Sequence, residues 1–389
     1  MIFRILLILL LFPYVGFVQG VDIQPLAGVA AILLAVFKLV VKRKTPRILG
    51  VFMFTIVSVL FSTLISIYLQ GIPHSSFVSM LFHLLMICSL FILKEEIIPL
   101  LTLRFVWLVV SIYTCVGVLQ IFIDESILSS AVYRGYQSLA DTGRGVRSLA
   151  SEPSTLGYTL ALLNALMLLR AKQDKRSKVF LVSLLFLFVN AFISRSAWAI
   201  FIHIMPIWLF LFFKWKKFFL MSIGIAPLLV ALIANSTDEV RLFYLFNALL
   251  KNPELLMAEG AMKKVLNVPI SLLLGATNGM LGMSYLGNLK ELNIMLPGGY
   301  FFVERFGNKN MGGVLEFWIQ LGLFSTPILY FLVLTIKRCL SLSYSLMPIL
   351  ILCFTFFIYN SIGHPLPWII IIIINDLYAK NLYQVRNGR

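Results

Sequence analysis

The chain has 389 residues, of which 60% are hydrophobic and 12% are charged, and its formal net charge is +16. Soluble domains are about half apolar and about a quarter charged, so this composition excludes an ordinary water-soluble globular protein. It predicts an all-α polytopic membrane protein. The basic excess would indicate nucleic acid in a soluble chain. In a membrane protein it is typical of cytoplasmic loops rich in Lys and Arg, so we expect a lipid bilayer and no nucleic acid as partner.

Apolar runs follow one another along most of the chain. A helix needs about 20 apolar residues to cross a bilayer, and twelve runs approach this length. They predict about 12 transmembrane helices in a single integral membrane domain, residues 1–389. Only Ser194-Arg195-Ser196 separates the seventh run from the eighth. The runs are 5–18, 23–41, 48–69, 77–93, 103–123, 155–169, 178–194, 196–213, 218–234, 313–334, 345–360 and 366–379.

The charged residues give the predicted topology. With the N-terminus in the cytoplasm, the inner segments hold 21 of the 32 Lys and Arg residues and 4 of the 16 Asp and Glu residues. The outer segments hold the other 11 basic and 12 acidic residues. This distribution follows the positive-inside rule. An even number of helices then places both termini in the cytoplasm.

Two outer segments are too long to be simple connections. They are 124–154 and 235–312, and the second contains helical apolar spacing at 240–250 and 254–266. Loops of this length often carry function. We expect short helices lying on the outer membrane surface and closing over a cavity.

Arginines retained at the outer face are the first candidates for chemistry. They are Arg134, Arg144 and Arg147 in the first loop, Arg195 in the Ser-Arg-Ser turn, and Arg305 before the tenth run. A guanidinium presents a planar fork of donors that matches phosphate oxygens. These residues predict binding of a lipid-linked pyrophosphate; ordinary loop or lipid-headgroup contacts are the alternative.

A carboxylate stands at the start of the sixth run. Glu152 could accept a proton from a sugar hydroxyl as a general base, or orient an arginine. It could equally be an acid favoured by the dipole of the helix N-terminus. Ser151 or Ser154 could cap that helix and add backbone donors for an anion. Glu304 and Glu316 carry the same two interpretations.

The sequence contains no motif for several other classes of enzyme. The sequence lacks a Walker motif, GxSxG and HExxH, and it has no DxD-like pair for a metal-bound nucleotide sugar. We therefore expect no metal and no cofactor. The four cysteines suggest neither a disulfide framework nor a metal site. For His364, beside Pro365, a capping or interfacial role is favoured over a catalytic one.

Short motifs recur in the order found in a known family. The chain resembles the Wzy-type polymerases of O-antigen and capsule synthesis, within the O-antigen ligase/polymerase superfamily. Arg134 and Gly145, with ten residues between them, are similar to an Arg-x10-Gly pattern of some polymerase loops. The other matching stretches are Arg147-Ser-Leu-Ala-Ser-Glu152-Pro-Ser154-Thr-Leu-Gly157, Ile193-Ser-Arg195-Ser196, Leu274-Gly-Ala-Thr-Asn-Gly279, Asn308-Lys-Asn310 and Glu316-Phe-Trp-Ile-Gln-Leu-Gly322-Leu323.

The resemblance implies a bacterial inner-membrane glycosyltransferase with its active site facing the periplasm. It would transfer a glycan from undecaprenyl pyrophosphate to an incoming lipid-linked repeat without a metal. Arg147 and Arg195 would hold the donor pyrophosphate, with Arg305 contributing from the long loop. The family usually works with a chain-length regulator and a flippase.

Two alternatives remain. The first is an O-antigen ligase, although ligases carry a histidine near the end of the long loop and 235–312 contains none. The second, from another class, is a transporter or flippase of lipid-linked oligosaccharide. A flippase should line its path with charged residues, and the apolar runs contain very few.

Overall fold

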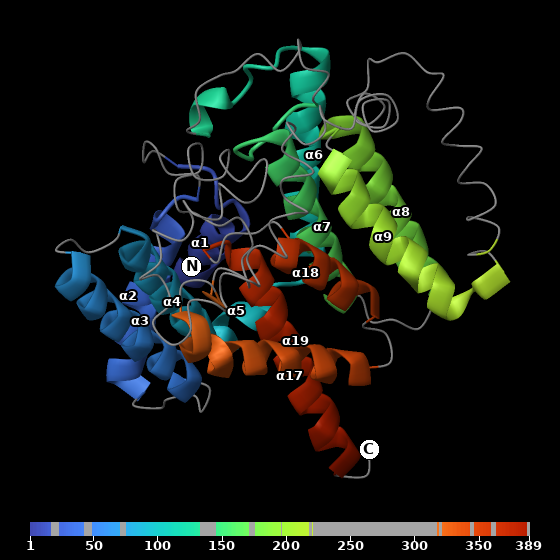
Figure 1. The fold of residues 1–389 in the computed structure, drawn as a ribbon. Helices are drawn as coiled ribbons and strands as arrows, with labels where there is room; N and C mark the ends of the chain where they lie inside the picture. Colours follow the sequence, from blue (N-terminus) through green and yellow to red (C-terminus); the bar gives the residue numbers. More distant parts are fainter. Residues whose placement is uncertain are drawn as a thin grey trace, which may run out of the picture.

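The computed structural model describes residues 1–16, 23–42, 49–70, 75–132, 145–170, 176–195, 197–217, 220, 317–318, 321–342, 346–358 and 363–386. These residues fold mainly into helices (Figure 1). The second long loop, 235–312, and the predicted span 218–234, except for Leu220, lie outside this part of the chain. The α-helices are α1 (Ile2–Leu11), α2 (Leu26–Lys42), α3 (Leu49–Gln70), α4 (Ser75–Ile92), α5 (Lys94–Leu100), α6 (Leu103–Phe122), α7 (Pro153–Arg170), α8 (Arg176–Ile193), α9 (Ala197–Lys214), α17 (Thr326–Ser341), α18 (Leu346–Ile358) and α19 (Pro365–Arg386).

The all-α prediction is confirmed for the described residues, which contain no strand. Extended pairing there is limited to an isolated bridge between Val15 and Val132. Each predicted span within the described part overlaps a helix, and α8 and α9 are separate at the Ser-Arg-Ser turn, as predicted. The first long loop contributes one short 3-10 helix, Ser129–Ala131, from its described residues.

Some predicted spans differ from the helices in their bounds. Helix α1 stops at Leu11, well before residue 18, because Pro13 disfavours helical backbone at Phe12. The predicted span 313–334 ends too early, since α17 covers Thr326–Ser341 after a 3-10 turn at Gly322–Ser325, and the first residues of this span, 313–316, lie outside the described part of the chain. Pro327 lies in the first turn of α17, where proline is well tolerated.

The predicted number of twelve transmembrane helices is not supported. Among the described residues, two helical segments, Leu103–Phe122 and Leu323–Ser341, are long and apolar enough to cross a membrane. Two such helices are weak support for a membrane location.

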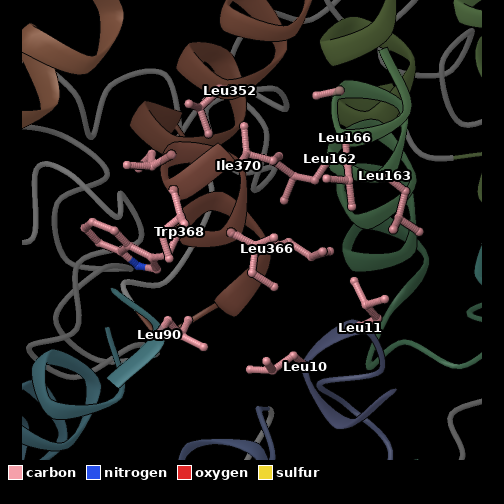
Figure 2. Packing of buried hydrophobic residues seen from close by; sticks show 14 of the residues in the cluster. Leu10, Leu11, Leu90, Leu162, Leu163, Leu166, Leu352, Leu366, Trp368 and Ile370 are labelled. Carbon is pink, nitrogen blue, oxygen red and sulfur yellow. The ribbon is translucent and has the colours of Figure 1, made fainter. Parts of the chain in front are cut away.

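Helices α7 and α19 form the centre of the fold. Residues 155–169 of α7 and 365–374 of α19 are buried on every side, as expected for helices that are apolar all round. Figure 1 shows them between the α2–α4 group and the α8–α9 pair. Figure 2 shows Trp368, Leu366 and Ile370 of α19 among side chains of neighbouring helices, including Leu162 and Leu166 of α7. The two central helices therefore give a fixed position to the residues that precede them in the chain.

Helix α2 has its small residues inside and its large ones outside. Ala27, Ala31 and Ala35 are buried, whereas Leu33 is 65% and Phe37 is 68% exposed. This side of α2 packs closely on α4, because a side chain at Gly28 would meet the Phe82 ring at 2.6 Å. Small residues at i and i+4 facing a neighbour, with large apolar residues facing away, are typical of helices packed in lipid. A soluble helix shows the reverse arrangement.

This pattern predicts opposite sensitivities on the two faces of α2. Replacing Ala31 by leucine should lower the free energy of unfolding by about 1–3 kcal/mol, because the buried face has no room for it. Replacing the exposed Leu33 by alanine should change it by less than about 0.5 kcal/mol. Thermal unfolding of both variants in detergent measures the difference, and equal losses would contradict the assignment of faces.

Basic side chains donate hydrogen bonds to carbonyl groups near helix ends, on the side predicted to be cytoplasmic. Lys38 Nζ donates to the Ile92 carbonyl at the end of α4 and to Glu96 Oε2, both at 2.7 Å. Arg170, at the end of α7, donates from Nη2 to the Ile98 carbonyl of α5 at 2.7 Å. Segments that the charge distribution assigns to one side thus lie together, because the last carbonyls of a helix need donors.

Candidate functional site at the start of α7

The start of α7 is built by four consecutive residues, Ser151 to Ser154. Pro153 is the first helical residue, as predicted, and the Glu152 carbonyl accepts the first helical bond from Leu156 N at 3.0 Å. Glu152 therefore occupies the capping position and is half-buried. The predicted cap at Ser151 or Ser154 is wrong. Ser151 Oγ donates to Thr155 Oγ1 at 3.1 Å, and Ser154 is the second residue of the helix, with a side chain outside what the structure describes.

Arg147 lies in the segment just before α7 and is buried, with 7% of its surface exposed. The adjacent Ser148 has left-handed backbone, with φ of 52°. Its N–H donates to Gln120 Oε1 at 2.7 Å and its hydroxyl donates to the Tyr113 carbonyl at 2.6 Å. Gln120 and Tyr113 belong to α6, so this helix fixes the backbone beside Arg147.

Arg195 follows the end of α8 and is exposed. The N–H groups of Ser194 and Arg195 both donate to the Asn190 carbonyl, at 3.0 and 3.3 Å. Arg195 has φ of 45°, the left-handed conformation that glycine usually provides at this place after a helix. An arginine here keeps a strained backbone.

A backbone contact joins the Arg147 segment to the Arg195 turn. Val146 N–H donates to the Ile193 carbonyl at 3.0 Å. At Gly145 a Cβ would lie 2.1 Å from that same carbonyl oxygen and 2.4 Å from the Ser194 carbonyl carbon. Only glycine permits this approach. The structure therefore brings together the two chain segments that carry the predicted catalytic arginines, with the Arg147 side chain buried and the Arg195 side chain exposed.

The strain at Arg195 predicts a gain in stability when it is removed. Left-handed backbone destabilises a non-glycine residue by about 1–2 kcal/mol, and glycine removes this strain. Glycine also gives the unfolded chain more conformational freedom, which offsets roughly 0.5–1 kcal/mol of the gain. Arg195→Gly should therefore raise the free energy of unfolding by roughly 0.5–1 kcal/mol. Chemical unfolding in detergent measures this change, and a lower stability would contradict the description of the turn.

Five other predicted site residues lie outside the described part of the chain. They are Arg134, Arg144, Glu304, Arg305 and Glu316. Their roles remain predictions. Among the residues that the structure does describe, Arg147 is the one buried side chain of the Lys, Arg, Asp and Glu type.

A cluster of two tyrosines and a histidine at the ends of α1, α7 and α19 was not predicted. The hydroxyls of Tyr14 and Tyr158 are 3.1 Å apart, and the His364 ring packs at 5.7 Å from the first ring and 6.0 Å from the second. His364 Nδ1 accepts from Leu366 N–H at 3.3 Å, which confirms its capping role. Burial lowers the pKa of His364 to about 3, so its imidazole is neutral and adds no cation.

Within the described residues, no three His, Cys, Asp or Glu side chains gather as they would to hold a metal ion. Comparison with protein-family models, with curated proteins and with solved structures finds no match for this chain. Function therefore has to be inferred from the residues of the site.

Proposed function

We propose that this chain is a Wzy-type polymerase that joins lipid-linked oligosaccharide repeats of an O-antigen or capsule at the periplasmic face of the bacterial inner membrane. The observation that carries the proposal is the contact between Val146 and Ile193, which places the Arg147 segment beside the Arg195 turn. The family resemblance implies that these two arginines, far apart in the chain, bind one pyrophosphate. Their segments do meet in space.

The membrane location draws support from three features. Two described helices are long enough to span, α2 turns its large apolar residues outward, and the basic residues follow the positive-inside rule. The Arg147 and Arg195 segments both lie on the side that this rule assigns to the periplasm.

The two arginines suit the departure of a lipid pyrophosphate. The bond between the anomeric carbon of the growing glycan and the pyrophosphate oxygen breaks, and a bond forms from that carbon to a hydroxyl oxygen of the incoming repeat. Negative charge grows on the pyrophosphate, where fixed donors and cations are most effective. Arg147, being buried, acts at low effective dielectric, while the exposed Arg195 can reach a ligand from solution. Glu152 is our candidate to accept the hydroxyl proton.

A flippase of lipid-linked oligosaccharide is the alternative from another class. A transport path for a charged headgroup should carry charged side chains between the helices. In the described part of the chain the buried charged side chain is Arg147, which lies outside the helices. This favours chemistry at one surface over passage through the fold.

Deletion of the gene followed by gel analysis of the surface polysaccharide tests the proposal. Loss of a polymerase leaves a single repeat on the core. Loss of a ligase leaves no repeat attached while long lipid-linked chains accumulate, and loss of a flippase strands single repeats in the cytoplasm. An unchanged ladder would contradict the proposed function.

A further inference from the structure

We infer that two buried carboxamides, Gln120 of α6 and Asn190 of α8, are positioning residues that hold the arginine segments in place. We call them the carboxamide clamp. Each bonds a serine directly beside an arginine: Gln120 bonds the backbone of Ser148, beside Arg147, and Asn190 bonds the hydroxyl of Ser194, beside Arg195. The inference rests on the proposed function, because it assigns the clamp to the orientation of the pyrophosphate site.

Asn190 joins three helices to the Arg195 turn. Its Nδ2 donates to the Gly157 carbonyl of α7 at 2.9 Å and contacts His203 Nε2 of α9. A carbonyl only accepts, so the atom facing Gly157 must be the amide nitrogen, and His203 Nε2 must be the unprotonated nitrogen of its ring. The amide oxygen accepts from Ser194 Oγ at 2.9 Å. All hydrogen-bonding directions of the carboxamide are thereby assigned.

Gln120 bonds both backbone groups of Ser148. Its Oε1 accepts from Ser148 N–H at 2.7 Å, and its Nε2 donates to the Ser148 carbonyl at 3.3 Å and to the Ile127 carbonyl at 2.8 Å. A carboxamide that accepts from and donates to the same residue imitates a paired strand. It therefore fixes the left-handed backbone of Ser148 without a regular element.

Both carboxamides are buried, so their hydrogen bonds must be satisfied within the protein. Gln120 is 1% and Asn190 is 0% exposed, and a buried amide is tolerated only when its hydrogen bonds are made. The two carboxamides are therefore held in one orientation each. They fix the positions of Ser148 and Ser194, and through these the positions of the neighbouring arginines. The bond between Val146 and Ile193 then links the two halves. Rigid support of this kind matters because displacement of a reacting group by about 1 Å can lower a rate about a hundredfold.

The test uses substitutions that keep volume and remove hydrogen bonding, Gln120→Met and Asn190→Leu, in the full-length protein in detergent. The matched control is Asn375→Leu. Asn375 is a carboxamide that accepts from Arg338 and donates to Thr335 Oγ1 at 3.1 Å, but it lies ten residues into α19, about 15 Å along the helix from its start. Initial rates of polymer formation from lipid-linked repeats are measured per mole of folded protein.

We expect the clamp variants to be about tenfold to a hundredfold slower than the wild type, and Asn375→Leu to keep the wild-type rate per folded molecule. A second arm combines Asn190→Leu with Arg195→Lys, which retains charge and measurable turnover. If Asn190 acts through Arg195, the double variant is about as slow as the slower single variant. Rates that multiply, or clamp variants that match the wild type, would overturn the inference.

A binding arm separates this inference from the proposed function. The same proteins are titrated with undecaprenyl pyrophosphate, and the clamp variants should bind it less tightly than Asn375→Leu. A wild-type protein that makes no polymer but shows this difference in binding contradicts the polymerase and supports the clamp. A wild-type polymerase whose clamp variants bind and turn over normally supports the function and contradicts the clamp.

Discussion

Alanine at Arg147 or at Arg195 is expected to abolish polymer while the protein still folds and inserts. Each substitution removes a cation from the place where the leaving pyrophosphate gains charge. Loss of one such donor lowers a rate by about 10²–10³-fold, which is enough to reduce a polysaccharide ladder to a single repeat. Gel analysis of cells carrying each variant, with quantification of the protein in the membrane fraction, measures the effect.

Two further variants sharpen this prediction. Arg195→Lys keeps the charge but loses the planar fork, so it should give a shortened or sparse ladder. Arg104 is an exposed arginine near the start of α6, on the side predicted to be cytoplasmic, and Arg104→Ala should leave the ladder unchanged. Normal ladders from Arg147→Ala and Arg195→Ala together would remove the pyrophosphate hypothesis.

Gly145→Ala is expected to be nearly as damaging although it removes no functional group. The new Cβ would lie 2.1 Å from the Ile193 carbonyl oxygen, and backbone atoms on both sides cannot yield as the end of a long side chain can. The Arg147 segment must then move away from the Arg195 turn. We expect a loss of stability of about 1–3 kcal/mol together with loss of polymer.

Gly50 provides the matched control, because a Cβ there would meet nothing within 4 Å. Gly50→Ala lies near the start of α3 and should be neutral or stabilising, by up to about 1 kcal/mol. Thermal unfolding in detergent and ladder analysis are compared for the two variants. A Gly145→Ala protein with wild-type stability and a full ladder would contradict the importance of this contact.

The helices of this protein could be predicted from the sequence because long apolar runs leave few other solutions. Local signals also set some boundaries correctly, such as Pro153 at the start of α7 and the Ser-Arg-Ser turn after α8. Composition could not show which helices combine the length and the apolarity needed to cross a bilayer, and two segments do so among the described residues. It also gave no sign of α5, which lies in a charged segment and contains Pro99.

The candidate site was only partly predictable. Arg147, Arg195 and Glu152 could be selected by residue type and by motif, but the bond from Val146 to Ile193 is a tertiary contact with no local signal. Gly145 was noted only as part of a spacing pattern. Gln120 and Asn190 were missed because a single amide in an apolar run has no distinguishing feature until its partners are known.

The most direct measurement of the central claim uses purified protein, lipid-linked repeats and a metal chelator. We expect the wild-type protein to extend the repeats into a polymer and to release undecaprenyl pyrophosphate, and Arg147→Ala and Arg195→Ala proteins of the same purity not to do so. Absence of polymer from the folded wild-type protein, or formation of polymer only when a divalent metal is restored, would contradict it.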